Sequence, residues 1–565
     1  MAGGSSHPDP AFLARLARRQ QMNYESMILF AGTMTGFFFV ICLALLLRRL
    51  FIELDASRRP SLITAFLRSS RAAILHRPSR LPSGGHAILM GCYLVINITV
   101  TFTNMDNENM PLLSNLASRT GWMAVANLLI VVLLSLKNTP VAVLTASSYE
   151  RLNILHRIAG YTTLTFALVH SCSYAAVFGK QNFLQRLLVR EEIFGMVAML
   201  SFLALALAGA FLRTWWYELF YYLHVTFWVL AIIMTGLHQP ELSNKVIFAV
   251  CATAGIWVLE RIVRFIRIAI NSTNNTVTLV PLPNGGTRVT LAKHIMGSSS
   301  GKHGFLWIPA VRACETHPFT MVSANPIEFV VAAHDGFTQT LHKCAVRNPG
   351  IELKASVEGP YGTFPAARGY GKILLVAGGS GASFTVGAAL DMVRRLDPDD
   401  EVDIEFIWMI RNRTYLAWFS EHLKTLRKDP RVSVKVYVTR ASTAELVIQE
   451  QPPSSTSSSS ITFIEPDPEK EGLSRPTMAR LSLDIEKHKD SSPVEIPLPS
   501  DVVFRYGRPD VDALVREAIQ NMPSDKRVLV MGCGPRTLMS TVRNTTADCI
   551  MDNRGVELHL EQFGW

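Results

Sequence analysis

Four histidines lie within apolar stretches of the chain and form two pairs with the same internal spacing. One stretch holds His156 and His170, another holds His224 and His238, and the members of each pair are 14 residues apart. In an α-helix this separation places both side chains on one face, about 21 Å apart along the axis. Imidazole is a common axial ligand of haem iron, so two such helices can hold two stacked haems. The spacing therefore predicts two bis-histidine haem sites, formed by His156 with His224 and by His170 with His238.

The stretches that carry these histidines belong to a strongly apolar half of the chain. Hydrophobic residues make up 49% of the 565 residues and charged residues only 18%, below the roughly 25% of soluble domains. Ionisable residues inside membrane spans are rare and usually functional, which favours ligation over packing for the histidines. Seven stretches are long enough to cross a bilayer as helices. They cover about residues 27–47, 86–103, 120–136, 156–178, 193–212, 217–238 and 246–263.

Basic residues between these stretches predict the orientation of the chain in the lipid bilayer. Lys and Arg are concentrated in segments that lie inside if the N-terminus lies outside, above all in the Arg-rich segment 48–80. The positive-inside rule then places the N-terminus outside and the C-terminal half in the cytosol. An internal N-terminus with six or eight spans is the alternative. These flanks account for the net charge of +10, so we expect no nucleic-acid partner.

The soluble half begins with a set of short strands. Residues 277–291 contain two strands joined by an Asn-Gly-Gly turn, a pattern typical of a hairpin. Short strands with turn signals between them predict a small antiparallel β-barrel. Further strands of this barrel are expected at 304–309, 327–333 and 351–357.

Buried strands alternate with helical segments in the remainder of the chain, which predicts a doubly wound α/β domain. Two glycine clusters follow strands of this domain: the turn Gly378, Gly379, Ser380 and Gly381, and the segment Cys533, Gly534 and Pro535. A glycine-rich turn between a strand and a helix can bind a phosphate through backbone N–H groups. Each cluster alone is equally consistent with a tight turn. The buried strands are expected at the start of 372–396 and at 401–410, 431–440 and 526–535.

These observations divide the chain into an N-terminal tail (1–26), a bis-haem transmembrane domain (27–267) and two soluble domains. The barrel is expected at 268–368 and the α/β domain at 369–565. Residues 449–500 interrupt the α/β domain and are rich in Ser, Pro and charged residues, so we expect a disordered insertion there.

Several short motifs follow the histidine pattern in a fixed order. They are HPFT (317–320), HDGFTQTL (334–341), VEGPYG (357–362), AGGSGASFT (377–385), GCGP (532–535) and the ending EQFGW (561–565). In this order they resemble the ferric reductase and NADPH oxidase superfamily, most closely fungal ferric-chelate reductases, over about residues 85–565. The resemblance implies a helical transmembrane bundle of about seven spans, an antiparallel β-barrel that binds FAD and a ferredoxin reductase-like α/β domain that binds NADPH. It also implies two b-type haems on the four histidines.

The resemblance implies roles for the motif residues of the barrel. The HPFT segment would bind FAD, and the turn after His334 would lie near the flavin pyrophosphate. The GPY residues would shape the loop between flavin and nicotinamide. The residues concerned are His317, Pro318, Phe319 and Thr320, then Gly336, Phe337 and Thr338, and finally Gly359, Pro360 and Tyr361.

In the α/β domain, the resemblance implies that the turn 378–381 holds the NADPH phosphates and that 533–535 lies beside the nicotinamide. Phe563 would stack on the isoalloxazine ring and move aside for the nicotinamide. The wider family often has Ile-Thr-Pro after the last glycine of the turn, whereas this chain has Ala-Ser-Phe-Thr, so Thr385 is the candidate for the family's threonine. Arg411 and Arg413 follow a strand and could pair with the NADPH 2′-phosphate, or be exposed arginines without a ligand.

Together the motifs predict a transmembrane enzyme that passes electrons from cytosolic NADPH through FAD and two haems to an external ferric or cupric chelate. One alternative is reduction of O2 to superoxide, and another is a degenerate homologue that acts as a subunit. The second would be expected to lack a haem ligand or a nucleotide motif, and all of them are present. The plasma membrane is the expected location, with the vacuole or another endomembrane as the alternative. A permease or a second copy of the chain as partner is left open.

Overall fold

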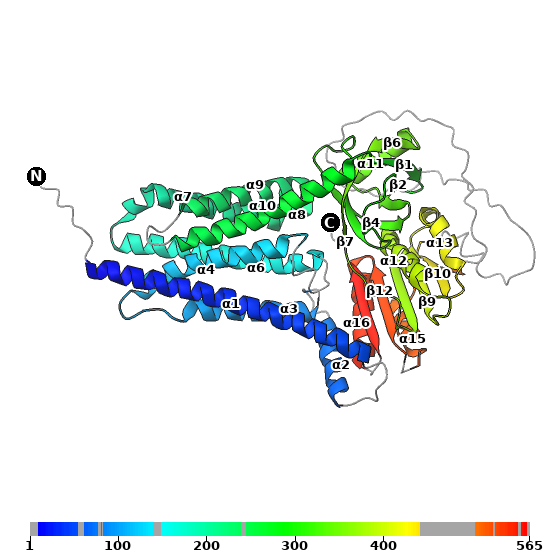
Figure 1. Ribbon diagram of the computed structural model, residues 1–565, viewed down its shortest axis with the longest axis horizontal. Helices are drawn as coiled ribbons and strands as arrows, with labels where there is room; N and C mark the ends of the chain where they lie inside the picture. Colours follow the sequence, from blue (N-terminus) through cyan, green and yellow to red (C-terminus); the bar gives the residue numbers. More distant parts are fainter. Residues whose placement is uncertain are drawn as a thin grey trace, which may run out of the picture.

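A long bundle of helices and two β-sheets make up the chain, and both sheets lie at the same end of the bundle (Figure 1). The structure is a computed structural model that describes residues 10–54, 62–76, 81, 83–138, 149–238, 244–440, 503–523, 526–551 and 555–561. The expected insertion at 449–500, and Phe563, lie outside these residues.

All seven of the predicted apolar stretches are helical. Of the helices in the described ranges, 6 are long and apolar enough to cross a membrane. The exception is α6, which carries two histidines and several hydroxyl side chains and packs along α4. A π-helical turn at Ala208–Leu212 extends α7 into the short helix α8 (Arg213–Trp215). The bundle helices are α1 (Pro10–Leu54), α3 (Gly84–Phe102), α4 (Leu112–Ser135), α6 (Tyr149–Lys180), α7 (Arg190–Leu207), α9 (Tyr217–Leu237) and α10 (Lys245–Ser272).

The predicted N-terminal tail is wrong for residues 10–26, because α1 already begins at Pro10. Polar contacts with α4 stabilise this extension. The Arg19 guanidinium donates to Ser114 Oγ at 2.8 Å, and the Asn23 amide donates to Ser118 Oγ at 2.9 Å. Hydrophobic patterning identifies only the apolar part of a span. The polar start of α1 was therefore not predicted, because contacts with another helix stabilise it.

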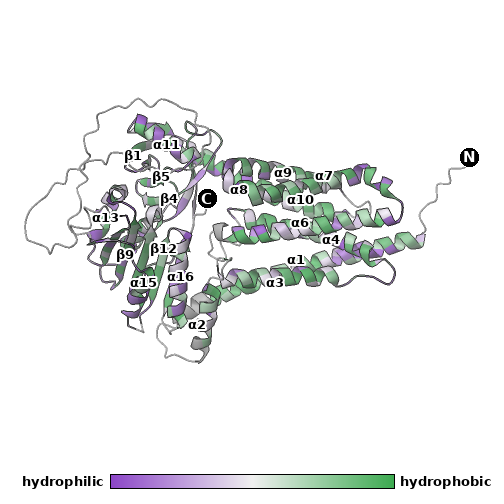
Figure 2. Cartoon of the chain, turned by 180° about the vertical axis from the view of Figure 1, so that it is seen from behind, coloured by the Kyte–Doolittle hydropathy of each residue, from purple (hydrophilic) through white to green (hydrophobic). Residues whose placement is uncertain are grey.

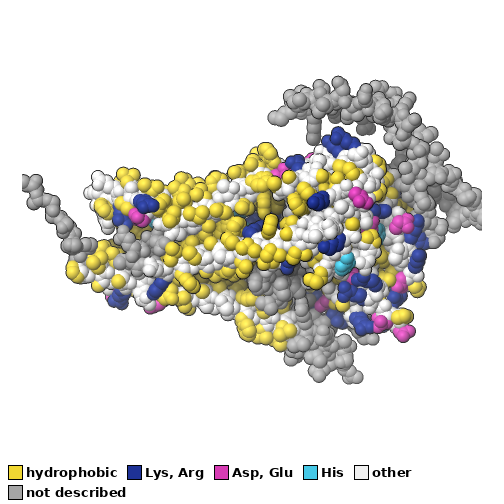
Figure 3. All heavy atoms as spheres, turned by 45° about the horizontal axis from the view of Figure 1, so that its top comes forward, with side chains coloured by type: hydrophobic (Ala, Val, Ile, Leu, Met, Phe, Trp, Pro, Cys, Tyr) yellow, Lys and Arg dark blue, Asp and Glu magenta, His cyan; other side chains and the backbone are white. Residues whose placement is uncertain are grey.

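Apolar residues predominate along the bundle helices (Figure 2), and the face of the bundle drawn in Figure 3 is apolar along most of its length. Large side chains such as Phe39, Leu200 and Phe248 are 65%, 65% and 77% exposed. Continuous exposed apolar surface of this extent is unfavourable in water and favourable in lipid. The chain is therefore a multi-pass membrane protein, and its polar and charged side chains gather on the part that carries the sheets (Figure 3).

The first sheet has seven antiparallel strands in the order β6-β1-β2-β5-β4-β3-β7. The predicted β1–β2 hairpin is present, and positive φ angles at Asn284 and Gly285 (54° and 75°) suit its tight turn. Strand β4, which contains the HPFT motif, was not among the predicted strands. The strands are β1 (Thr276–Leu282), β2 (Gly286–Leu291), β3 (His303–Trp307), β4 (His317–Ala324), β5 (Ile327–Ala332), β6 (Ile351–Lys354) and β7 (Ser356–Tyr361), with α11 (Gly336–Arg347) between β5 and β6.

The second sheet has six parallel strands in the order β11-β10-β9-β8-β12-β13, and the chain order reverses between β8 and β12. The predicted strands correspond to β8, β9, β10 and β12, whereas β11 and β13 at the two edges were not predicted. The strands are β8 (Lys372–Gly378), β9 (Asp403–Ile410), β10 (Val432–Val438), β11 (Val503–Tyr506), β12 (Val528–Cys533) and β13 (Val556–Glu561).

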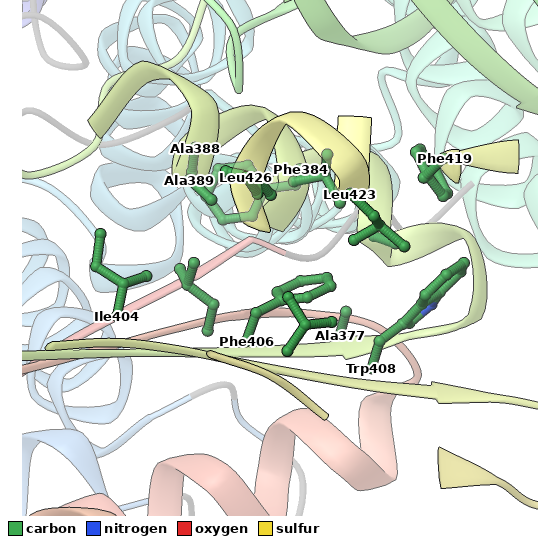
Figure 4. Close-up of a cluster of buried hydrophobic side chains, with 14 of the residues drawn as sticks. Ala377, Phe384, Ala388, Ala389, Ile404, Phe406, Trp408, Phe419, Leu423 and Leu426 are labelled. Atoms are coloured by element: carbon green, nitrogen blue, oxygen red, sulfur yellow. The ribbon is translucent and has the colours of Figure 1, made fainter. Parts of the chain in front are cut away.

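Helices cover both faces of this parallel sheet, as expected for a doubly wound domain. On one face, Phe406 and Trp408 of β9 pack against Phe384 of α12 (Ala382–Arg395) and Leu423 of α13 (Ser420–Arg427) (Figure 4). The other face is covered by α15 (Val511–Gln520) and α16 (Arg536–Met551). The short helix α2 (Leu62–Leu75) packs on α16 through its buried Ala72 and so connects the bundle to this domain.

Candidate functional site

The four intramembrane histidines meet in the two pairs that their spacing predicts. The ring centroids of His156 and His224 are 6.3 Å apart, and those of His170 and His238 are 6.0 Å apart. Two imidazoles that bind one metal ion from opposite sides, each with a metal–nitrogen bond of about 2 Å, have centroids about 6 Å apart. Both pairs thus have the separation that axial ligation requires.

Backbone carbonyls hold three of these rings in one orientation. Nδ1 of His156 lies 2.9 Å from Val131 O, Nδ1 of His170 lies 2.8 Å from Ala117 O, and Nδ1 of His238 lies 2.7 Å from Glu191 O. A carbonyl oxygen only accepts, so Nδ1 carries the hydrogen and Nε2 has the free lone pair. Histidines that bind metals commonly donate their second ring nitrogen in this way.

We call His156 and His224, which lie toward the sheets, the inner pair, and His170 and His238 the outer pair. Two glycines allow neighbouring helices to approach the outer pair. A Cβ atom at Gly121 of α4 would lie 2.5 Å from His170 Nδ1, and one at Gly195 of α7 would lie 2.7 Å from His238 Nδ1. Neither glycine was predicted from the sequence to contact a histidine. A glycine within an apolar span has many explanations, and only the contact with the ring identifies its role.

The donor set suits haem better than a metal ion bound by side chains alone. Among the described residues, no group of three or more His, Cys, Asp or Glu could hold a metal ion. Two opposed imidazoles complete the coordination of an iron whose other four ligands come from a porphyrin. The histidine pairs therefore fit haem.

A cavity of about 520 Å³ extends from the inner histidine pair to the first sheet. His156 and His224 line one part of it, and Thr316 and His317, at the start of the HPFT motif, line another. The guanidinium groups of Arg157, Arg213 and Arg261 also border the cavity, and they can neutralise acidic groups of a ligand. One continuous space thus joins the predicted haem ligands to the predicted flavin residues.

The HPFT residues lie on β4 and are ordered by aromatic packing. The His317 ring stacks on Phe337 with centroids 4.3 Å apart, and Phe319 packs on the same ring at 6.2 Å. His317 Nε2 lies 3.1 Å from Glu315 Oε2. Burial lowers the pKa of His317, and Glu315 opposes this shift. Pro318 pairs with Phe305 in β3, and Thr320 is buried.

The second FAD motif starts α11, where backbone N–H groups point out of the helix. Gly336 has a φ of 58°, a conformation that glycine adopts without strain. Thr338 Oγ1 accepts a hydrogen bond from the His334 N–H at 2.9 Å, which closes the turn. Phe337 itself is 1% exposed, so its side chain orients His317 from within the core. The resemblance implies that the turn containing Phe337 lies near the flavin pyrophosphate. Because the Phe337 side chain is buried, it supports the HPFT strand from below and leaves only backbone atoms of this residue to face a ligand.

A buried ionic cluster joins the barrel sheet to the bundle. Glu358 of β7 is 0% exposed and accepts hydrogen bonds from Arg264 Nε at 2.8 Å and Nη2 at 3.0 Å. Lys137, directly after α4, lies 3.4 Å from the same carboxylate, and the Tyr361 hydroxyl donates to it at 2.7 Å. Sequence reasoning missed this cluster, because its members lie far apart along the chain.

Charge balance in this cluster keeps Glu358 ionised. Burial alone would raise the pKa of the Glu358 carboxyl, but the Lys137 charge and the Arg264 hydrogen bonds hold it below its ordinary value. Burial and the neighbouring carboxylate raise the pKa of Tyr361, so its hydroxyl stays protonated and able to donate. The motif residues Gly359 and Pro360 follow, and Gly359, at a φ of 144°, brings β7 close to Gly304 of β3.

The two glycine clusters of the α/β domain meet at the carboxyl ends of β8 and β12. A Cβ atom at Gly381 would overlap the Cys533 carbonyl, and one at Gly378 would lie 2.7 Å from Pro535 Cδ. Gly379 has a φ of 57° and open space beside it, and its carbonyl accepts from Trp408 Nε1 at 2.9 Å. Ligands of doubly wound domains bind where the strand order reverses, and these clusters lie at that point.

The remaining candidates of this domain differ in their surroundings. Ser380 and Arg411 are exposed near the ends of β8 and β9. Gly534 contacts Gly378. Thr385 is 0% exposed within α12, and its hydroxyl donates to Ala382 O at 3.4 Å, so the structure does not bring it to the surface of the turn. Cys533 is buried, and burial raises the pKa of its thiol.

Comparison with protein families divides the chain into the same three parts. Residues 120–235 match the model for a ferric reductase like transmembrane component, and residues 271–365 match an FAD-binding domain. Residues 370–547 match the ferric reductase NAD binding domain.

Curated fungal proteins are similar to this chain over much of its length. Ferric/cupric reductase transmembrane component 2 of Schizosaccharomyces pombe is 25% identical over 403 residues, which cover 61% of this chain and 70% of that protein. The probable cell surface ferric reductase kap2 of Aspergillus oryzae is 28% identical over 344 residues (55% and 46%). Ferric reductase transmembrane component 4 of Saccharomyces cerevisiae is 25% identical over 470 residues (80% and 63%). The matches thus span between about half and 70% of these relatives.

Among solved structures, the ferredoxin reductase in carbazole 1,9a-dioxygenase is similar over 51% of this chain and 69% of its own, at 13% identity and a TM-score of 0.32.

The three family matches follow one another in the order of the bundle, the barrel sheet and the parallel sheet. On these matches and the fungal relatives, the chain belongs to the ferric reductase family.

Proposed function

We propose that this protein is a transmembrane oxidoreductase that moves electrons from NADPH through FAD and two b-type haems to an external ferric chelate, with a cupric chelate as a second acceptor. The observation that carries the proposal is the stacked arrangement of the two histidine pairs, of which the inner pair shares a cavity with His317. A chain of cofactors needs such continuity, because each transfer requires a short distance between donor and acceptor.

When bound, FAD converts hydride chemistry to single electrons and the haems carry those electrons one at a time. The protein binds, orients and insulates these groups. Nε2 of each histidine would bind iron, and the carbonyls of Val131, Ala117 and Glu191 fix the rings for this purpose. Arg157, Arg213 and Arg261 would neutralise the haem propionates. Because two histidines would hold each haem iron, an acceptor would receive its electron without binding the iron.

The predicted nucleotide and flavin residues would bind NADPH and FAD and hold them in place for electron transfer. The exposed backbone of Gly379 and the start of α12 would receive the NADPH phosphates, with Arg411 close to the 2′-phosphate. The N-terminal turn of α11 would face the flavin pyrophosphate, and His317 would contact the flavin on the cavity side. The transfer through FAD needs no catalytic acid or base from the protein.

The location follows from the same arrangement. The Pro10 end of α1 and the two sheets lie at opposite ends of the bundle (Figure 1), which supports an external N-terminus and cytosolic nucleotide sites. We propose the plasma membrane, since one relative is named as a cell surface ferric reductase.

Spectroscopy and acceptor competition test this function. The reduced-minus-oxidised spectrum of the purified protein should show b-type haem at two per chain, and absence of this signal would refute the proposal. NADPH oxidation should be stimulated by Fe(III)-citrate and by Cu(II), and insensitive to superoxide dismutase. Chelate reduction that superoxide dismutase abolishes would instead identify an enzyme that reduces O2.

A further inference from the structure

Aromatic rings continue from the outer histidine pair to the end of the bundle that is remote from the sheets. Tyr174 packs on His170 with ring centroids 5.1 Å apart, Phe178 lies 5.6 Å from Tyr174, and Phe183 lies 6.3 Å from Phe178. His170, Tyr174 and Phe178 follow one another at intervals of four residues on α6, so their rings lie on one face of that helix. We name Tyr174, Phe178 and Phe183 the aromatic stripe.

The stripe ends at the surface. Phe183 is 52% exposed, whereas Tyr174 and Phe178 are partly buried. Phe183 follows the end of α6 and precedes the short helix at Leu184–Leu188. The chain between α6 and α7 lies at the end of the bundle opposite the two sheets (Figure 1). A series of neighbouring rings, with successive centroids 5.1 to 6.3 Å apart, therefore leads from a predicted haem ligand to the exposed Phe183.

The segment on either side of Phe183, residues 180–192, carries three cationic side chains (Lys180, Arg186 and Arg190) and two carboxylates (Glu191 and Glu192). Lys180 and Arg190 are exposed, and Arg190 lies over the Phe194 ring at 5.5 Å. Arg186 is paired with Glu192 at 3.4 Å. A surface of this kind favours an anionic ligand with apolar or planar portions.

We propose that the aromatic stripe is the docking site of the external acceptor and that this acceptor is an anionic metal chelate. This inference rests on the proposed function. The chelate lies against Phe183 and Phe178, with Lys180 near its negative groups. With haem bound at His170 and His238, one electron would pass to the chelate and reduce Fe(III) to Fe(II) or Cu(II) to Cu(I), the haem being oxidised by one electron, with no bond made or broken and no proton moved.

Two measurements on the holoenzyme isolate this step from NADPH and FAD. In the first, the protein is reduced with dithionite without oxygen, and Fe(III)-citrate is added while the haem spectrum reports reoxidation. In the second, binding of Ga(III)-citrate, which cannot be reduced, is measured on the oxidised protein by equilibrium dialysis. The variants are Phe178→Leu, Phe183→Leu and Lys180→Gln. The matched control is Phe102→Leu, since Phe102 is 60% exposed at the end of α3 and outside the stripe.

Each aromatic variant should slow reoxidation about three- to tenfold and weaken Ga(III)-citrate binding by a similar factor, as expected for loss of one aromatic contact. The haem content and spectrum should stay unchanged, and Phe102→Leu should match the wild type. Lys180→Gln should weaken binding of citrate chelates most at low ionic strength.

Reoxidation and binding in the aromatic variants equal to those of the wild type would overturn the stripe as the docking site. Wild-type protein that lacks haem, or whose reduced haem Fe(III)-citrate does not reoxidise, would overturn the proposed function itself. The two failures are therefore distinguishable.

Discussion

At the scale of single residues, each intramembrane histidine needs a partner ring and a group that fixes its orientation. The 14-residue repeat predicts the partner ring of each histidine. For three of the four histidines a carbonyl on another helix orients the ring, as Ala117 O does for His170. The first requirement is visible in the sequence, since it depends on spacing along one helix. The second is not, because any residue supplies a carbonyl.

Replacing His170 should separate the two haem sites. His170→Ala removes one axial ligand of the outer pair and leaves His156 and His224 in place, so the haem content should fall from about two per chain to about one. Reduction of FAD by NADPH should continue, while reduction of external acceptors should cease. Haem content is measured as the pyridine haemochrome, and His86→Ala, at the start of α3, is the control. Retention of two haems would contradict the assignment.

Gly121→Ala tests the space beside the outer pair. The new Cβ would lie 2.5 Å from His170 Nδ1, which would displace the ring from its carbonyl and from its partner. We expect loss of the outer haem signal with the inner one retained. Gly255→Ala is the matched control, because nothing lies within 4 Å of a Cβ atom at that glycine on α10. An unchanged spectrum in Gly121→Ala would show that the ring tolerates the methyl group.

At the scale of elements, the bundle and the barrel sheet are joined by side chains from α10, from the segment after α4 and from β7. Glu358 is fully buried between Arg264 and Lys137, so its carboxylate is paired with basic groups and is not an isolated buried charge. Loss of one member of such a buried cluster is costly because the remaining charges stay desolvated.

Glu358→Gln should destabilise the protein by about 3 kcal/mol near neutral pH, since Arg264 and Lys137 would lose their anion. The pKa of Glu358 is lowered in the folded state, so its stabilising effect is complete above the ordinary value of 4.5 and is lost as the pH falls through the folded value. The difference in melting temperature between wild type and variant should therefore shrink in acid. Glu352→Gln, an exposed residue of β6, is the control. A constant difference at all pH values would contradict an ionised Glu358.

A second junction lies between α1, α3 and α4. Arg119 is 1% exposed and donates to Asn23 Oδ1 at 2.7 Å and to Val100 O and Thr103 O, both at 2.8 Å. Arg119→Leu should lower the melting temperature in detergent, because buried acceptors without donors are unfavourable. Arg18→Leu, whose side chain is 67% exposed, should have little effect. Equal melting temperatures for Arg119→Leu and the wild type would argue against this junction.

At the scale of the whole molecule, the apolar surface of the bundle and the charged surface around the sheets divide the chain into a membrane part and a part outside it (Figure 3). The N-terminal end of α1 is remote from the sheets, so an external N-terminus requires cytosolic nucleotide sites (Figure 1). An epitope before residue 10 should bind antibody on intact cells, whereas an epitope after residue 565 should require permeabilisation. The reverse pattern would place the electron path in the opposite direction.

The sequence by itself determined the features that depend on local spacing. Local patterns along the chain predict the seven helical stretches, the two 14-residue histidine spacings, the β1–β2 hairpin and the glycine turn after β8. The helical start at Pro10 and the edge strands β11 and β13 were not predicted, because their signals are short or polar and depend on neighbours.

Only the tertiary structure decided which distant residues meet. It brought Gly121 to His170, joined Glu358 to Arg264 and Lys137, extended the cavity at His156 and His224 to His317, and aligned the rings from Tyr174 to Phe183. These contacts arise from packing between elements, whose relative positions depend on the summed burial of many side chains. Periodicity along one helix carries no record of that sum, so contacts between elements that share no repeat, such as Gly121 with His170, are visible only in the fold.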